Sequence, residues 1–120
     1  MTTYLSLEDL LSLTNDLEVG PVRDLGLLDS AAHRPQTELI GYEAYQMLDE
    51  KVAVLLESIV RNHPLVDGDK RLAWLAAVVF YGLNDEVLEA PDDDAYDLVI
   101  GMASLQLDYP AAAELLAGWH

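Results

Sequence analysis

The stretch that decides the fold is His63-Pro64-Leu65-Val66-Asp67-Gly68-Asp69-Lys70-Arg71-Leu72-Ala73-Trp74-Leu75-Ala76-Ala77-Val78-Val79-Phe80-Tyr81. Residues 72–81 are apolar on every face of a helix, which predicts a helix buried in the middle of a small domain. Residues 63–71 bring a histidine, carboxylates, a glycine and two cations together just before that helix. Backbone N–H groups and the positive end of the helix dipole meet at a helix start, where an anion can bind. The stretch therefore predicts a phosphate site at the start of a buried helix.

Length and composition predict one domain, residues 1–120, because a chain of 120 residues buries about two-thirds of the surface that it exposes when unfolded. The chain has no cysteine, which excludes disulfides, Cys-ligated zinc and thiol chemistry. The first residues lack the features of a signal peptide, and no apolar stretch reaches the roughly 20 residues of a membrane span. We therefore expect a soluble cytoplasmic protein with no membrane partner.

The charge balance narrows the class of partner. The chain has six Lys and Arg residues and 22 Asp and Glu residues, which gives a formal charge of −16. This negative charge argues against binding to nucleic acid or anionic membranes. A protein or a nucleotide is the expected partner. Lys70 and Arg71 lie side by side, and Arg61 lies shortly before them, so we expect the positive charge to concentrate around the loop.

Hydrophobic periodicity predicts an all-α fold, a compact bundle of about six helices around a buried central helix. Strand patterning is nearly absent. The expected helices cover residues 7–17, 24–32, 43–62, 68–83, 92–104 and 110–118. Ser6 and Asp9 predict a capping box for the first helix. Residues 91–94, a proline and three aspartates, predict N-caps and carboxylates that complement the helix dipole for the fifth.

The sequence also predicts a loop, three core residues and a terminus. Residues 36–42 combine β-formers with a glycine, which predicts an exposed extended or hairpin-like loop. Trp74, Phe80 and Tyr81 are expected in the core, and His120 in a frayed terminus.

The side chains of the loop suggest their own chemistry. His63 follows a predicted helix, and a histidine with the ordinary pKa of about 6.5 can accept a proton from a hydroxyl group; a helix C-cap or surface residue is the alternative. Asp67 could hold Mg²⁺ that also binds phosphate oxygens, or could N-cap the central helix, and both roles can coexist. Gly68 allows close approach of the backbone to a ligand. Lys70 and Arg71 lie in the first helical turn, where the dipole disfavours cations, and a bound phosphate chain explains them.

Residues 63–71 resemble the signature of the Fic/Doc superfamily, His-x-Phe-x-(Asp/Glu)-(Gly/Ala)-Asn-(Gly/Lys)-Arg. Lys70 stands where most adenylyl-transferring Fic enzymes have glycine, and Trp74 stands where they have a second arginine. Both differences point to the Doc branch, the death-on-curing toxins. Residues 26–31, 61–62 and 94–99 also resemble Doc-type sequences, so the resemblance covers essentially the whole chain.

The resemblance implies a toxin that uses ATP to phosphorylate a threonine of elongation factor Tu and so halts translation, with an antitoxin that restrains it. By the same resemblance, His63 would deprotonate the target hydroxyl and Asp67 would hold Mg²⁺. Gly68, Asp69, Lys70 and Arg71 would form the ATP phosphate site. Residues 36–42 would be the flap, a hairpin that aligns the target peptide by strand addition; an unstructured polar loop is the alternative. Nucleotidyl transfer, and a weakened homologue that mainly binds the antitoxin, are the other candidate functions.

Two residues depart from the signature. Leu65 replaces the usual Phe, a buried anchor, and we expect Leu to be tolerated there. Asp69 replaces an Asn whose amide can donate to phosphate. At about 4 Å and an effective dielectric near 20, the repulsion between a carboxylate and a phosphate charge is on the order of 4 kcal/mol. Asp69 is therefore either an additional metal ligand or the mark of a weakened site.

Some Fic proteins carry an internal inhibitory helix. Residues 14–19 come close to its motif, (Ser/Thr)-x-x-x-Glu-(Gly/Asn), but end in Val19. We therefore expect a separate antitoxin to act as the inhibitor.

Overall fold

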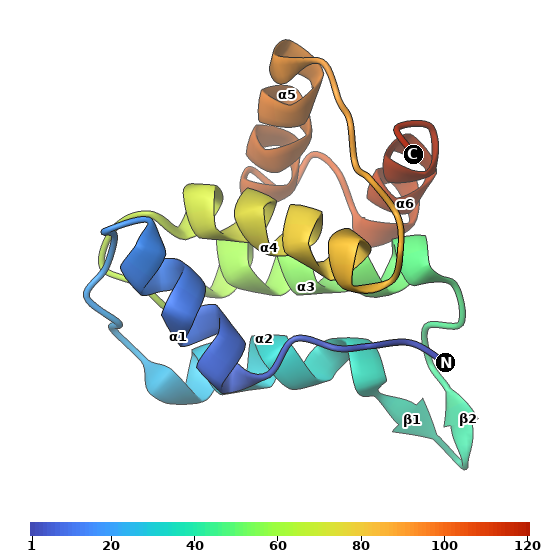
Figure 1. Cartoon of the computed structure of the whole chain (residues 1–120), viewed down its shortest axis with the longest axis horizontal. Helices are drawn as coiled ribbons and strands as arrows, with labels where there is room; N and C mark the ends of the chain where they lie inside the picture. Colours follow the sequence, from blue (N-terminus) through green and yellow to red (C-terminus); the bar gives the residue numbers. More distant parts are fainter.

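The computed structural model describes residues 1–120 as a helical bundle, in agreement with the all-α prediction. Its elements are α1 (Leu7–Asp16), α2 (Leu25–His33), the short 3₁₀ helix η1 (Arg34–Gln36), β1 (Glu38–Leu39), β2 (Tyr42–Glu43), α3 (Leu48–Asn62), α4 (Asp69–Leu83), α5 (Asp92–Ala103) and α6 (Tyr109–Ala117). Helices α3 and α4 lie in the middle, with α1 and α2 on one side and α5 and α6 on the other (Figure 1). None of the helices combines the length and the apolar content that crossing a bilayer requires.

The centre of the bundle is α3. Every residue from 51 to 60 is buried, and α3 contacts α2, α4, α5 and α6. The prediction that the helix over 68–83 would be buried on every face is wrong, because α4 buries only one side, and Trp74, Leu75 and Val78 on the other remain partly exposed. A single cluster of 25 buried apolar residues draws side chains from all six α-helices.

The N-cap predicted for α1 is observed, and the one predicted for α5 is not. Ser6 and Asp9 form the predicted capping box, with Oγ and Oδ2 accepting the N–H groups of Asp9 and Ser6 at 3.1 and 2.9 Å. For α5 the expectation of an Asp N-cap is wrong: its N-cap is Pro91, without a side-chain bond. The three aspartates lie in the first turn of α5, where their charge complements the helix dipole, as also predicted.

Residues 38–43 form a hairpin, which confirms the hairpin-like alternative over an unstructured loop. Glu38 pairs with Glu43 and Leu39 with Tyr42, and the turn exposes Ile40 almost completely. Helix α3 begins at Leu48, not near residue 43 as predicted, because Tyr42 and Glu43 are held in this pairing.

A buried charge network ties three elements together. The Glu57 carboxylate, 8% exposed, lies 2.9 Å from Arg34 of η1 and 3.2 Å from Arg61 of α3, and it accepts the Tyr109 N–H of α6. Arg61 also donates to two backbone carbonyls in and just after α5. The expectation that Arg61 adds positive charge to the loop is therefore wrong, because its charge is neutralised inside the bundle.

The segment after α6 is docked, so the prediction of a frayed terminus at His120 is also wrong. The two ring nitrogens of His120 lie 2.7 Å from Asp49 and 3.2 Å from Glu86. Its ring packs on Tyr81 with 4.6 Å between centroids, and the Tyr81 hydroxyl donates to Asp49 at 2.5 Å.

Candidate functional site

The loop between α3 and α4 has an unusual backbone at both ends. His63 is the C-cap of α3 and adopts the left-handed conformation with φ 51° and ψ 60°. Gly68 is the N-cap of α4, also left-handed with φ 99°. The N-cap position makes no side-chain hydrogen bond, so the alternative in which Asp67 caps this helix is wrong. Pro64 follows His63 and stops α3.

A second segment, residues 19–24, lies along this loop, and we call it the strap. The Gly20 N–H donates to the Asp67 carbonyl at 2.9 Å, and the Val66 N–H donates to the Pro21 carbonyl at 2.9 Å. Val22 and Leu65 form an isolated antiparallel bridge. Leu65 is 1% exposed, which confirms that leucine serves as the buried anchor of the loop.

Gly68 touches the strap rather than open space. A Cβ at this position would lie 2.4 Å from Val19 Cβ, closer than side-chain carbons approach one another. Together with its positive φ, this contact explains why the position needs a glycine.

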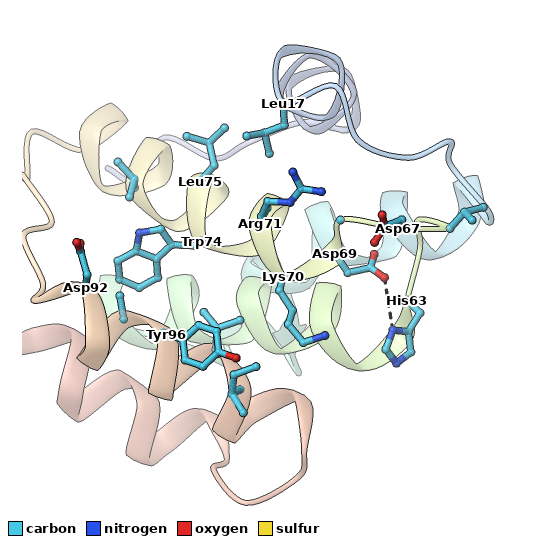
Figure 2. A pocket seen from close by; sticks show the side chains of 16 residues that line it. Leu17, His63, Asp67, Asp69, Lys70, Arg71, Trp74, Leu75, Asp92 and Tyr96 are labelled. Atoms are coloured by element: carbon cyan, nitrogen blue, oxygen red, sulfur yellow. Dashed lines mark ion pairs between the residues drawn. The ribbon is translucent and has the colours of Figure 1, made fainter.

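A cavity of about 840 Å³ opens beside the loop (Figure 2). All six predicted site residues line one end of it, namely His63, Asp67, Gly68, Asp69, Lys70 and Arg71. The other end is a largely apolar wall from α4 and α5, made mainly by Trp74, Leu75, Val78, Tyr96, Val99 and Ile100, with the Asp92 carboxylate at its edge near Trp74 (Figure 2). The cavity therefore combines a charged end with an apolar end, as a ligand with a phosphate chain and a hydrophobic part would require.

Lys70 and Arg71 are the free cations of the molecule. The other four Lys and Arg residues are engaged: Arg34, Lys51 and Arg61 in ion pairs and Arg23 with backbone carbonyls. No ion pair includes Lys70 or Arg71, and both line the cavity. Figure 2 shows Lys70 on the side of Tyr96 and Arg71 on the side of Leu17. In a chain with formal charge −16, these two side chains are the cations that remain available to an anion.

Asp69 is turned into the loop. Its Oδ1 accepts the Leu65 N–H at 3.0 Å, and its Oδ2 lies 3.4 Å from His63 Nδ1 (Figure 2). The side chain is only 11% exposed. Asp69 therefore braces the loop with one oxygen and faces the histidine with the other, while the His63 side chain remains 62% exposed.

Asp67 has a free, exposed carboxylate at the edge of the cavity, and only its backbone carbonyl is bonded within the chain. No group of three or more His, Asp or Glu side chains is arranged to hold a metal by itself. A single carboxylate fits Mg²⁺, because this ion is usually held by one or two carboxylates together with substrate phosphates. The donor set of the site is therefore compatible with a magnesium nucleotide.

Sequence reasoning missed the apolar wall and the strap. Trp74 was expected in the core, but it lines the cavity, whereas Phe80 and Tyr81 are buried as expected. Tyr96 and Val99 share one face of α5 at helical spacing, a signal that could have indicated a second wall. The contact between the strap and the loop has no signal in the local sequence.

Comparisons with known proteins show what the chain is similar to. A sequence model of the Fic/DOC family matches residues 4–81, which include the whole loop. A curated relative, the Toxin Doc of Mycolicibacterium smegmatis (strain ATCC 700084 / mc(2)155), is 45% identical over an alignment of 123 residues. That alignment covers 99% of this chain and 95% of the relative.

Proposed function

Because the chain belongs to the Fic/DOC family, we propose that it is the toxin of a toxin–antitoxin system and that it transfers a phosphate from ATP to a hydroxyl group of a target protein. The observation that carries this proposal is the placement of the two unpaired cations, Lys70 and Arg71, beside His63 at one end of the cavity. A base for a hydroxyl group and an anion site for a phosphate chain are the two parts that phosphoryl transfer needs.

Each residue of the loop has its own role in the proposed transfer. An imidazole nitrogen of His63 accepts the hydroxyl proton as the hydroxyl oxygen forms its bond to the γ-phosphorus. The bond from that phosphorus to the oxygen bridging the β-phosphate breaks, and ADP leaves with the electron pair. Lys70, Arg71 and the backbone N–H groups at the start of α4 offset the negative charge of the phosphates. Asp67 would hold Mg²⁺, which supplies further positive charge to the phosphate oxygens when bound.

Further parts of the proposal follow the family resemblance. The target hydroxyl would belong to a threonine of elongation factor Tu, and with such a target the protein would act in the cytoplasm. Lys70 in the signature favours phosphoryl over adenylyl transfer. The hairpin at residues 38–43, with its exposed Leu39, Ile40 and Tyr42, supports a flap that pairs with an extended target segment. The formal charge of −16 favours an antitoxin with a basic binding segment.

One observation favours another candidate function, that of a weakened homologue that mainly binds its antitoxin. Asp69 brings a carboxylate to the edge of the phosphate site, where the signature has an amide. Its charge opposes the binding of ATP. The fold does not depend on bound ATP, so a chain weakened in this way could still bind an antitoxin.

The experiment is a transfer assay with purified protein, Mg²⁺, elongation factor Tu and ATP labelled on the γ-phosphate. We expect label on the factor with the native chain and none with His63→Ala. His33→Ala is the matched control, because His33 is exposed at the end of α2, outside the cavity. ATP labelled on the α-phosphate distinguishes nucleotidyl transfer from phosphoryl transfer, since only nucleotidyl transfer leaves that label on the target. Transfer that persists in His63→Ala would contradict the proposed mechanism, and no transfer from either the native chain or Asp69→Asn would contradict the kinase proposal.

A further inference from the structure

We propose that Arg23 of the strap is a positioning residue for His63: it holds the left-handed backbone of that histidine and thereby keeps the imidazole at the mouth of the cavity. The inference rests on the proposed function, in which His63 is the base. It concerns a residue 40 positions away in the chain.

The first observation is the pair of bonds made by the Arg23 guanidinium. Its Nε donates to the His63 carbonyl at 2.7 Å and its Nη2 donates to the Asn62 carbonyl at 2.9 Å. Carbonyls at the end of a helix lack partners within the helix, and a cation there is favoured by the helix dipole. The flat, forked guanidinium can satisfy two of them at once, which an ammonium group cannot do with the same geometry.

The backbone of Arg23 makes a further link. Its N–H donates to the Pro64 carbonyl at 2.7 Å, so Arg23 binds the carbonyls of Asn62, His63 and Pro64 in succession. The bridge between Val22 and Leu65 holds the strap in place next to these bonds. Arg23 is therefore fixed to the loop on both sides of the histidine.

The second observation is the conformation that these bonds enclose. His63 has φ 51°, a region that residues other than glycine seldom adopt because Cβ crowds the backbone. Such conformations persist where the surroundings hold them, and they often occur at functional residues. The His63 side chain is 62% exposed, and the one ion-pair contact of its ring is with Asp69 Oδ2 at 3.4 Å. The backbone conformation therefore sets the direction in which the side chain leaves the loop, and Asp69 orients the ring.

Arg23 does not line the cavity, which separates its role from that of Lys70 and Arg71. A substitution at Arg23 leaves the phosphate site intact and moves the base. We therefore expect it to lower kcat while the affinity for ATP stays unchanged. A general loss of folding would lower both together.

The test uses Arg23→Ala and Arg23→Lys in the full chain, with two readouts. The ¹³Cα and ¹³C′ chemical shifts of His63 report its backbone conformation without any need for activity. In Arg23→Ala we expect these shifts to leave the left-handed range and kcat to fall about 10- to 100-fold, as small misplacements of catalytic groups do. Arg23→Lys keeps the charge but loses the fork, and we expect an intermediate result.

Chemical rescue distinguishes positioning from general damage. Because Arg23 is exposed, added methylguanidinium can reach the vacated place in Arg23→Ala and should restore part of kcat and the shifts of His63. It should not restore kcat in His63→Ala.

Thermal unfolding of each variant checks that the chain is folded. If a variant fails to fold, slow exchange of the Arg23 Nε proton in the native protein tests the hydrogen bond to the His63 carbonyl.

Several outcomes would overturn the inference. Unchanged His63 shifts in both Arg23 variants, a fall in kcat without a change in those shifts, or rapid exchange of the Nε proton in the native protein would each do so. A native chain that transfers no phosphate contradicts the proposed function instead, and the shifts of His63 still decide the role of Arg23.

Discussion

The two carboxylate oxygens of Asp69 have different effects. One accepts a hydrogen bond that shapes the loop, and the other brings a negative charge to His63. The bond from the Leu65 N–H to Oδ1 needs an acceptor, which an asparagine amide also provides. The charge that Oδ2 presents to His63 Nδ1 at 3.4 Å is specific to aspartate. The departure from the family signature therefore changes the electrostatics of the site while keeping the acceptor that shapes the loop.

Asp69→Asn is expected to tighten ATP binding at least tenfold, measured by calorimetry with Mg²⁺. The reason is the removal of a repulsion on the order of 4 kcal/mol at 4 Å and an effective dielectric near 20, against about 1.4 kcal/mol for a tenfold change. Asp69→Ala is the control, since it also removes the acceptor for Leu65 and should cost about 1–3 kcal/mol of stability. Unchanged or weaker ATP binding in Asp69→Asn would show that the carboxylate contributes something other than repulsion.

Gly68→Ala is expected to destabilise the fold by about 2 kcal/mol or more, because it adds the cost of a left-handed residue to a clash with Val19. Gly41→Ala is a matched control: φ is +78° there, but nothing lies within 4 Å of the added Cβ. Urea unfolding measures both. We expect the loss caused by Gly68→Ala to be smaller in a Val19→Gly background, which removes the Cβ that the added methyl group meets. Equal losses at the two glycines would argue against the close contact.

At the scale of elements, the hairpin is fastened to α3 by one buried cation. The Lys51 side chain is 1% exposed, and its Nζ lies 3.3 Å from Glu43 of β2 and donates to the Tyr45 carbonyl. It also lies 5.8 Å from the centre of the Tyr4 ring. These contacts fix where the hairpin ends and α3 begins, although the sequence pattern continues as a helix.

Lys51→Met is expected to cost about 1–3 kcal/mol of stability, because the Tyr45 carbonyl loses its partner while the apolar stem is preserved. Exchange of the Ala44 amide, which closes the hairpin by donating to the Thr37 carbonyl, should become faster. Glu43→Gln, at an exposed carboxylate, should cost no more than about 1 kcal/mol. If Ala44 exchanges at the native rate in Lys51→Met, the hairpin is held by other contacts.

At the scale of the whole molecule, His120 joins segments that are distant in sequence. Its ring lies between Asp49 at the start of α3 and Glu86 after α4, and packs on Tyr81. Partial burial works against the charge of the imidazole, but its bonds to Asp49 and Glu86 outweigh that effect and raise the pKa of His120. Burial and the neighbouring Asp49 also raise the pKa of Tyr81, which keeps the phenol protonated.

This pairing predicts a pH dependence of stability. The folded state holds the His120 proton more tightly than the unfolded state, so the contribution is complete below about pH 6.5 and is lost as pH rises through the higher folded-state pKa. The difference in unfolding free energy between the native chain and His120→Gln should therefore be larger at pH 6 than at pH 9. Glu86→Gln should reduce the dependence. A difference that stays constant with pH would contradict the pairing.

Local signals predicted much of the fold. The predicted bounds of α1, α2, α4, α5 and α6 agree with the observed ones to within about one residue, since apolar periodicity and the residues that start or stop a helix act within about a turn of the chain. The start of α3 was missed because strand pairing and Lys51 override its helical pattern. For the site, the six residues singled out in the loop motif all line the cavity, and the roles assigned to them stay predictions.

By itself, the sequence determined the family, the helical class and the loop that carries His63, Asp67 and the two cations, because these depend on residues close together in the chain. Only the tertiary structure decided that Arg61 is neutralised by Glu57 while Lys70 and Arg71 stay free. It also decided that Asp69 turns towards His63 and that Arg23 holds the backbone of that histidine. The physical reason is that most of these arrangements depend on contacts between distant segments, which no local periodicity encodes.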